Sequence, residues 1–121
     1  MSDASQLPVL VVDDNEEMRR IVESVLGFYG YRAATLADGD AALAYLDANV
    51  APYLCLIDVT LPGRSGYDLL AHIEANDHPA RVVLMSGRGV DDEIASRALI
   101  GFLQKPFGFD ELKVLLDQFS G

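Results

Sequence analysis

Three acidic residues close two apolar runs and supply the groups needed for metal and phosphoryl chemistry. Asp13 and Asp14 follow Val9–Val12, and Asp58 ends the run that starts at Tyr53. Such runs are typical of strands buried on both faces, as in a parallel sheet covered by helices. The carboxyl ends of these strands are where open α/β sheets bind ligands. An aspartate that only caps the next helix is the structural alternative for Asp58.

Two further polar residues close two later apolar runs. Ser86 follows Arg81–Met85, and Lys105 follows Phe102–Gln104. Converging carboxylates repel one another, and a hard cation such as Mg²⁺, which prefers oxygen ligands, relieves that repulsion. The residue types therefore predict a site in which carboxylates hold Mg²⁺ while a lysine and a hydroxyl stabilise phosphoryl oxygens. An aspartate carboxylate can itself be the nucleophile and form an aspartyl phosphate.

Five predicted strands alternate with five predicted helices. The strands are Val9–Val12, Tyr31–Leu36, Tyr53–Asp58, Arg81–Met85 and Phe102–Gln104. The helices start at Asp14 or Asn15, after Asp38-Gly39, at Tyr67, near Asp91 and near Phe109, and the fourth is expected to end at Leu99. This alternation predicts a parallel sheet with helices on both faces and right-handed crossovers. In the strand order 2-1-3-4-5, Asp13 and Asp14 would lie beside Asp58.

Composition limits the class of protein. The 121 residues suit one domain, 1–121, and no apolar run reaches the length of a membrane span. A net charge of −10 argues against a nucleic-acid surface. The N-terminal residues lack the pattern of a signal peptide, and the single cysteine, Cys55, excludes an internal disulfide, so a cytoplasmic location is expected. Cys55 lies inside an apolar strand and is expected to be a core residue.

Four motifs in order resemble the receiver domain of two-component response regulators, and the resemblance covers essentially the whole chain. The motifs are Val12-Asp13-Asp14, Asp58 with Leu61-Pro62-Gly63 and Gly66, Met85-Ser86-Gly87, and Lys105-Pro106-Phe107. Each is weak alone, and together they are specific. The resemblance implies a flavodoxin-like (βα)5 fold, a doubly wound parallel sheet with that family's strand order, 2-1-3-4-5.

The same resemblance implies a role for each site residue. Asp58 would be the phosphoacceptor, assisted by Ser86 and Lys105, with a cis peptide bond between Lys105 and Pro106. The metal ligands for Mg²⁺ would be Asp13, Asp14, Asp58 and the backbone carbonyl of Thr60. Ser86 and Phe102 would be the switch residues, and an ordinary core position is the alternative for Phe102.

The implied function is a phosphorylation-dependent signalling switch rather than an enzyme with its own substrate. A histidine kinase or phosphotransfer protein would donate the phosphoryl group, and the domain would assist its own phosphorylation and dephosphorylation. The surface around the fourth helix, fifth strand and last helix would then regulate a downstream protein or output domain. Neither nucleic acid nor membrane is an expected partner of this domain. The sequence leaves open whether the domain stands alone or belongs to a larger regulator.

One feature departs from the family pattern. Ala98–Gly101 leads almost directly into Phe102, which predicts a short or displaced fourth helix and weaker order over residues 88–101. Two histidines, His72 and His78, are expected on the surface, and Arg64 is expected to be a solvated loop residue.

Three other functions are weighed against the switch. A phosphate-independent receiver that serves only as a protein-interaction module is the principal alternative. A magnesium-dependent phosphatase would need a second acid soon after Asp58 and a cap over the substrate, and Val59-Thr60 supplies no acid. A flavodoxin-like cofactor module is disfavoured because the acids would repel a flavin phosphate.

Overall fold

The computed structural model describes residues 8–87 and 99–120, and of residues 99, 100, 119 and 120 only the backbone. Its strands form one parallel sheet in the order β2-β1-β3-β4-β5. The strands are β1 (Val9–Val12), β2 (Ala33–Leu36), β3 (Leu54–Asp58), β4 (Arg81–Ser86) and β5 (Leu99–Gln104). The predicted flavodoxin-like topology is confirmed.

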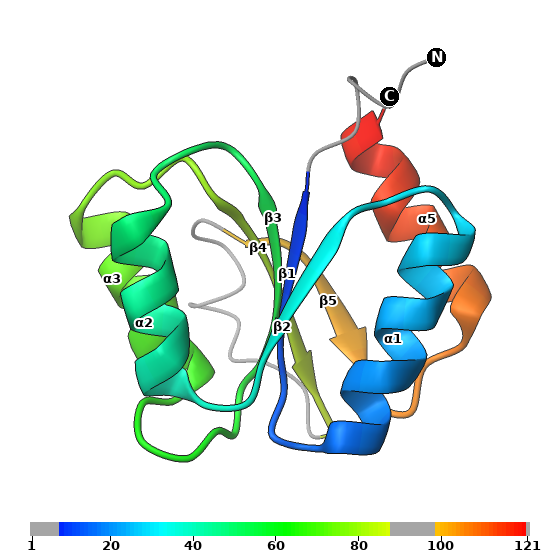
Figure 1. Ribbon diagram of the computed structural model, residues 1–121, viewed down its shortest axis with the longest axis horizontal. Coiled ribbons are helices and arrows are strands. Elements are labelled where there is room, and N and C mark those ends of the chain that lie inside the picture. Colours follow the sequence, from blue (N-terminus) through cyan, green and yellow to red (C-terminus); the bar gives the residue numbers. More distant parts are fainter. Residues whose placement is uncertain (1–7, 88–98, 121) are drawn as a thin grey trace.

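Helices cover both faces of this sheet. They are α1 (Glu16–Phe28), α2 (Gly39–Ala48), α3 (Gly66–Ala75) and α5 (Phe109–Ser120). Helices α2 and α3 lie against one face, and α1 and α5 lie against the other (Figure 1). None of the helices in the described part of the chain is long and apolar enough to cross a membrane.

Alternate residues of each strand enter two separate apolar layers because successive strand side chains point to opposite faces. In β3, Cys55 and Ile57 pack on the side of α2 and α3, whereas Leu54 and Leu56 pack on the side of α1 and α5. Cys55 is fully buried, as expected for a core residue, and burial raises the pKa of its thiol to about 12. The continuous apolar pattern of β3 thus reflects burial on both faces.

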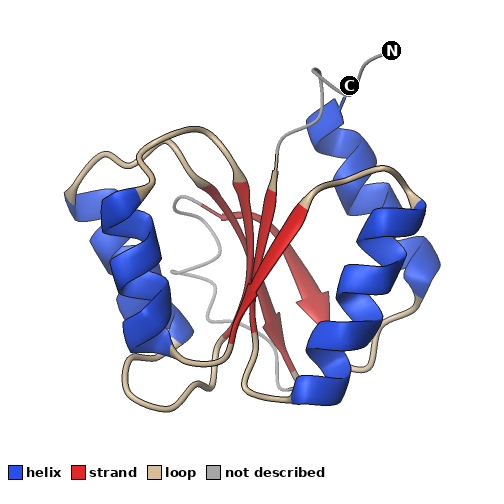
Figure 2. Ribbon diagram, viewed as in Figure 1, coloured by secondary structure: helices blue, strands red, loops and turns tan. Residues whose placement is uncertain are grey.

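Side-chain caps start three of the helices just after the carboxyl ends of strands. Asn15 Oδ1 accepts from the Met18 N–H at 2.9 Å, so Asn15 caps α1. Asp38 caps α2 in the same way. Ser65 caps α3 in a capping box with Asp68. The loops that join strands to these helices therefore gather along one edge of the sheet (Figure 2).

The region before β5 differs from the prediction. Strand β5 begins at Leu99, three residues before the predicted start, so a helix reaching Leu99 was wrong. The register with β4 shifts between Val82 and Val83, because Val82 pairs with Leu99 and Val83 with Gly101. The extra residue, Ile100, is accommodated as a bulge. The rest of the predicted fourth helix lies outside the described residues, as do residues 88–98 of the predicted weakly ordered segment.

Candidate functional site

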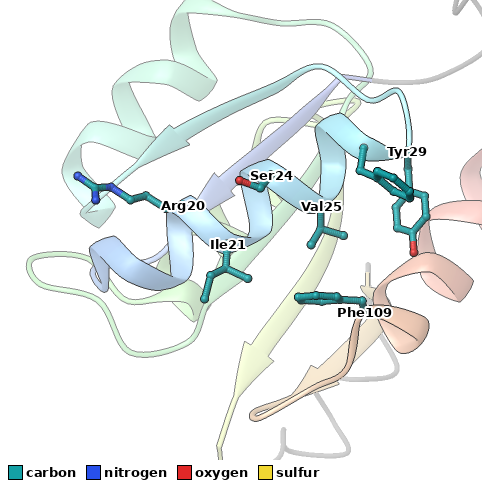
Figure 3. A pocket seen from close by; sticks show the side chains of 7 residues that line it. Arg20, Ile21, Ser24, Val25, Tyr29 and Phe109 are labelled. Carbon is teal, nitrogen blue, oxygen red and sulfur yellow. The ribbon is translucent and has the colours of Figure 1, made fainter.

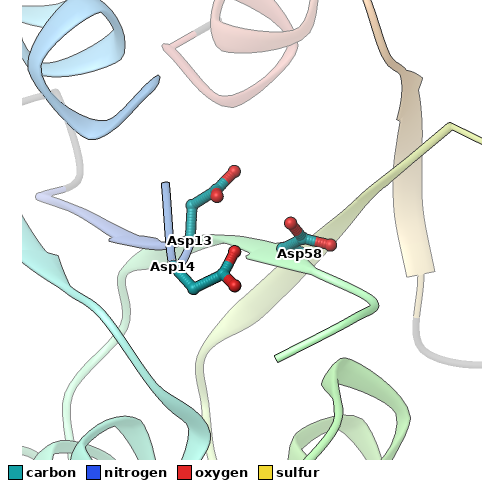
Figure 4. Close-up of side chains that lie close together, drawn as sticks. All are labelled: Asp13, Asp14 and Asp58. Atoms are coloured by element: carbon teal, nitrogen blue, oxygen red, sulfur yellow. The ribbon is translucent and has the colours of Figure 1, made fainter. Parts of the chain in front are cut away.

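The carboxyl ends of β1 and β3 bring three acids together. Val12 pairs with Ile57, so Asp13 and Asp58, the next residue of each chain segment, lie side by side. One carboxylate oxygen from each of Asp13, Asp14 and Asp58 lies within 4.8 Å of the others (Figure 4). Asp13 is 0% exposed and Asp58 is 8% exposed, whereas Asp14 is open to solvent. The predicted convergence of these acids is confirmed.

Lys105 reaches both buried acids from the end of β5. Its Nζ donates to Asp13 Oδ2 at 2.6 Å and to Asp58 Oδ2 at 2.8 Å. Burial acts to lower the pKa of Lys105, but the hydrogen bonds and charges of Asp13 and Asp58 outweigh it and raise that pKa above its ordinary value. The ammonium therefore stays charged, and the three acids outnumber the one lysine, so the site keeps a formal negative charge.

Backbone groups hold the second oxygen of each buried carboxylate. Asp13 Oδ1 accepts from the Asn15 N–H at 2.9 Å, and Asp58 Oδ1 accepts from the Thr60 N–H at 2.8 Å. Each acid is thus bound by a backbone amide on one oxygen and by Lys105 on the other. This arrangement fixes the direction in which each carboxylate faces before any ligand arrives.

Ser86 and Lys105 are joined through the backbone at the same edge. Ser86 ends β4 and is 9% exposed, and its carbonyl accepts from the Lys105 N–H at 2.8 Å. Asp58 pairs with Met85, so Ser86, the next residue of β4, lies beside the end of β3. The Lys105–Pro106 peptide bond is cis, as the resemblance implied. The structure therefore gathers Asp13, Asp14, Asp58, Ser86 and Lys105 at one place.

Phe102 lies on β5 and is partly buried. It packs against the apolar layer on the side of α2 and α3. This position is compatible with both a switch aromatic and an ordinary core residue, so its switch role stays a prediction. The Thr60 carbonyl likewise stays a predicted metal ligand, placed near Asp58 by the Thr60 amide contact.

The donor set fits Mg²⁺. All three acids offer hard oxygen ligands, which Mg²⁺ prefers, and a site of this kind needs only one or two carboxylates with water and phosphate oxygens. The net negative charge left after Lys105 pairs with two of them favours a divalent cation.

One residue that contacts the site was missed in the sequence. Arg19 Nη1, in α1, donates to the backbone carbonyl of Asp13 at 2.8 Å. Asn15 caps α1, and Arg19 follows one turn later and so lies near the start of the helix. The only sequence signal was this spacing, which does not distinguish a contacting arginine from a solvated one.

The two histidines lie away from the carboxylates, and both are partly exposed. His78 is half-buried, and its Nε2 lies 3.0 Å from the Leu46 carbonyl oxygen, near the end of α2. His72 pairs with Asp47 at 2.8 Å across α2 and α3. Arg64 is exposed and pairs with Asp40 at 3.2 Å.

An apolar hollow lies between α1 and α5. It encloses about 480 Å³ and is lined by Arg20, Ile21, Ser24, Val25, Phe28, Tyr29 and Phe109 (Figure 3). Phe28 is 83% exposed at its end. None of the predicted site residues lines this hollow, so it is a feature separate from the carboxylate site.

Several known proteins are similar to this chain in sequence. The chain is 36% identical over 122 residues to the 3',5'-cyclic-nucleotide phosphodiesterase regA of Dictyostelium discoideum, covering 93% of this chain and 15% of that protein. It is 32% identical over 108 residues to sporulation initiation phosphotransferase F of Bacillus subtilis, covering 87% and 86%. The chain spans half or less of regA and of three further regulators that it matches, from 15% to 50% of their length.

Solved structures of similar shape are receiver domains. The receiver domain of the sensor histidine kinase PA1611 from Pseudomonas aeruginosa, with magnesium coordinated in its active site cleft, superposes with a TM-score of 0.82 at 25% identity, covering 96% of this chain and 98% of that one. The receiver domain of Francisella response regulator 1452 superposes with a TM-score of 0.85 at 24% identity, covering 95% and 97%, and supports the fold alone.

The sequence profile of the response regulator receiver domain matches residues 9–117, nearly the whole described chain. That span contains all the acids, the serine and the lysine of the carboxylate site, and the structure places them together at one sheet edge. The chain therefore belongs to the response regulator receiver domain family.

Proposed function

We propose that Asp58 accepts a phosphoryl group from a phosphohistidine of a histidine kinase or phosphotransfer protein, in a reaction that requires Mg²⁺. The observation that carries this proposal is the contact of Lys105 Nζ with Asp58 Oδ2 at 2.8 Å, beside two further carboxylates. A carboxylate flanked by an ammonium and a cluster of acids suits a nucleophile whose product is an anion.

The transfer makes one bond and breaks one. A carboxylate oxygen of Asp58 attacks phosphorus, the O–P bond forms, and the N–P bond breaks with its electron pair left on the imidazole nitrogen. Lys105 lies within hydrogen-bond reach of Asp58 and would stabilise a phosphoryl oxygen after transfer. The Thr60 N–H holds the second carboxylate oxygen in a fixed direction.

Residues Asp13, Asp14 and Asp58, with the Thr60 carbonyl, would hold Mg²⁺. When bound, this ion would neutralise carboxylate and phosphoryl charge. Asp13 is fixed for this role from two sides, by the Asn15 amide and by Lys105. The exposed Asp14 leaves the site open to solvent and to a phosphodonor.

The phosphorylated domain would act as a switch. A phosphoryl group adds roughly −1.5 to −2 charge, which would draw Lys105 and the Ser86 hydroxyl toward itself. Strand β5 carries Phe102, and Lys105 follows it directly, so movement of Lys105 would shift β5 and change the surface that this strand forms with α5. That surface would address a downstream protein or an output domain on a longer chain.

The test is intact-mass measurement after incubation with Mg²⁺ and acetyl phosphate, wild type beside Asp58→Asn. We expect one added phosphoryl group in the wild type only, and loss of that addition when the metal is chelated. No addition from either acetyl phosphate or a phosphohistidine donor, with Mg²⁺ binding established separately, would reject the switch and favour a phosphate-independent interaction module.

A further inference from the structure

The junction between β2 and α2 supplies no side chain to the carboxylate site, yet it contacts the segments that carry Asp13 and Asp58. We propose that residues 36–40 are a positioning element that sets the distance between these two segments, with Gly39 as the residue on which it depends. Any effect of this element on the phosphorylation rate rests on the proposed phosphoryl transfer.

The first contact is with the segment of Asp13. The Asp13 N–H donates to the Leu36 carbonyl at 3.1 Å, directly after the paired residues Val12 and Leu36. The second contact is with the loop that follows Asp58. The Gly39 N–H donates to the Pro62 carbonyl at 3.2 Å, and this loop passes beside the start of α2 (Figure 2).

The approach of the loop to Gly39 leaves no room for a side chain. A Cβ atom at Gly39 would overlap the Arg64 carbonyl oxygen and lie 2.7 Å from the Arg64 carbonyl carbon. These are backbone atoms, so they cannot swing away as the end of a flexible side chain can. The loop therefore packs directly on the backbone of α2.

Asp40, in the first turn of α2, also lies close to two residues of the loop. Gly63 has φ +77°, and a Cβ there would lie 2.9 Å from Asp40 Oδ2. The Arg64 Nε lies 3.2 Å from Asp40 Oδ1, and both side chains are more than half exposed. Solvent weakens this exposed ion pair. A cation in place of Asp40 would still face both Arg64 and the backbone of Gly63 at close range, and would push the loop away from α2.

The loop passes this constraint to Asp58. At its far end the Gly66 N–H donates to the Val59 carbonyl at 2.9 Å, and a Cβ at Gly66 would lie 2.6 Å from the Asp58 carbonyl oxygen. The same loop contains Thr60, whose N–H donates to Asp58 Oδ1 at 2.8 Å. Displacement of the loop at Pro62 would therefore move the amide that orients the Asp58 carboxylate.

The experiment compares Gly39→Ala with Gly27→Ala. Both glycines lie in helices, and a Cβ at Gly27 meets nothing within 4 Å, so Gly27→Ala reports the effect of the added methyl group without a clash. Two properties are measured on the full chain without phosphodonor: the Mg²⁺ dissociation constant by calorimetry and the exchange rate of the Thr60 amide by NMR. We expect Gly39→Ala to weaken Mg²⁺ binding by about tenfold, as for loss of a group that orients a metal ligand, and to speed Thr60 exchange; Gly27→Ala should change neither.

A Gly39→Ala variant that loses thermal stability but keeps the wild-type Mg²⁺ dissociation constant and Thr60 exchange rate would overturn the proposal. If Gly39→Ala does not fold, the exposed variant Asp40→Lys decides, because it sets two cations against each other and repels the loop. We expect faster Thr60 exchange in Asp40→Lys and recovery in the Asp40→Lys/Arg64→Glu double variant. Unchanged exchange in Asp40→Lys would overturn the proposal equally.

These outcomes separate the two proposals. A wild type that accepts no phosphate, together with a Gly39→Ala effect on Thr60 exchange, would reject phosphoryl transfer alone. A wild type that is phosphorylated, together with Gly39→Ala at the wild-type exchange and phosphorylation rates, would reject the positioning element alone.

Discussion

The two ends of the sheet both carry polar residues, but they treat charge in opposite ways. At the carboxyl end, Asp13 and Asp58 are buried carboxylates that share Lys105. At the amino end, Tyr53 and His78 use neutral donors and acceptors to join the end of α2 to the strands. The first end retains charge for a ligand, whereas the second satisfies its groups within the protein.

At the amino end, the hydrogen-bond geometry determines which ring nitrogen of His78 carries the hydrogen. His78 Nδ1 accepts from the Ala80 N–H at 3.0 Å, which assigns the ring hydrogen to Nε2. This Nε2 then donates to the Leu46 and Asn49 carbonyls at 3.0 and 3.1 Å, and the Tyr53 hydroxyl donates to the Asn49 carbonyl at 2.9 Å. Burial raises the pKa of Tyr53, so its hydroxyl stays a donor. Polar groups that find their hydrogen-bond partners within the protein stabilise the fold, whereas the carboxylates at the other end keep charge that can bind a ligand.

Lys105→Met gives the largest expected effect, because it breaks the carboxyl end while keeping the length of the side chain. The phosphorylation rate should fall by about 10²-fold, as for loss of one group that stabilises transition-state charge. The free energy of unfolding should fall by about 1–3 kcal/mol, reduced from the value for a fully buried pair because Lys105 is partly exposed. Kinetics with acetyl phosphate and urea unfolding measure the two.

The matched control is Lys113→Met. Lys113 pairs with Asp117 on the surface of α5 at 2.8 Å, where solvent screens the pair, so its loss should change stability much less than the loss of Lys105. Equal effects of the two substitutions would contradict a special role for the buried pair. Addition of Mg²⁺ should restore part of the stability lost in Lys105→Met, since the cation replaces the missing charge.

Mg²⁺ itself should stabilise the folded wild type. At about one hundred times its dissociation constant, the ion should raise the free energy of unfolding by about 2.7 kcal/mol. Asp14→Asn should weaken that gain, since it removes one carboxylate of the cluster without disturbing a buried contact. Thermal unfolding with and without Mg²⁺ measures the difference, and identical gains in both proteins would exclude Asp14 as a ligand.

His78→Phe should break the amino end and leave the carboxyl end intact. It leaves the Ala80 N–H and the Leu46 carbonyl without their partner, which should cost about 1–3 kcal/mol of unfolding free energy. The phosphorylation rate of the folded protein should match the wild type. His72→Phe serves as control, because among the described residues the His72 side chain pairs with two exposed side chains, those of Asp47 in α2 and of Asn76, the C-cap of α3. A large loss of phosphorylation in folded His78→Phe would refute the separation of the two ends.

Tyr53→Phe gives the smallest expected effect. It removes one hydroxyl and its hydrogen bond to the Asn49 carbonyl, while the ring keeps its edge-to-face contact with His78. We expect a loss of about 1 kcal/mol in urea unfolding and no change in phosphorylation. A stability equal to that of the wild type would mean that the Asn49 carbonyl is satisfied by His78 alone.

Much of the carboxyl end follows from local sequence. Apolar runs that stop at Asp13 and Asp58 end their strands there, and parallel strands place such ends on one edge. Caps such as Asn15 and Ser65 start the following helices at the same edge. Residue type and position along the chain thus predicted the fold and the gathering of the acids.

Contacts between segments far apart in the sequence decided the features that the sequence did not predict. The early start of β5 depends on pairing with Val82, the burial of His78 depends on the end of α2, and the Gly39 contact depends on a loop more than twenty residues later. A single sequence shows only the turn that Gly39 begins, because its missing side chain matters only once Arg64 lies against it. The sequence by itself therefore determined which groups meet at the sheet edge, and the tertiary structure decided how the surrounding backbone holds them.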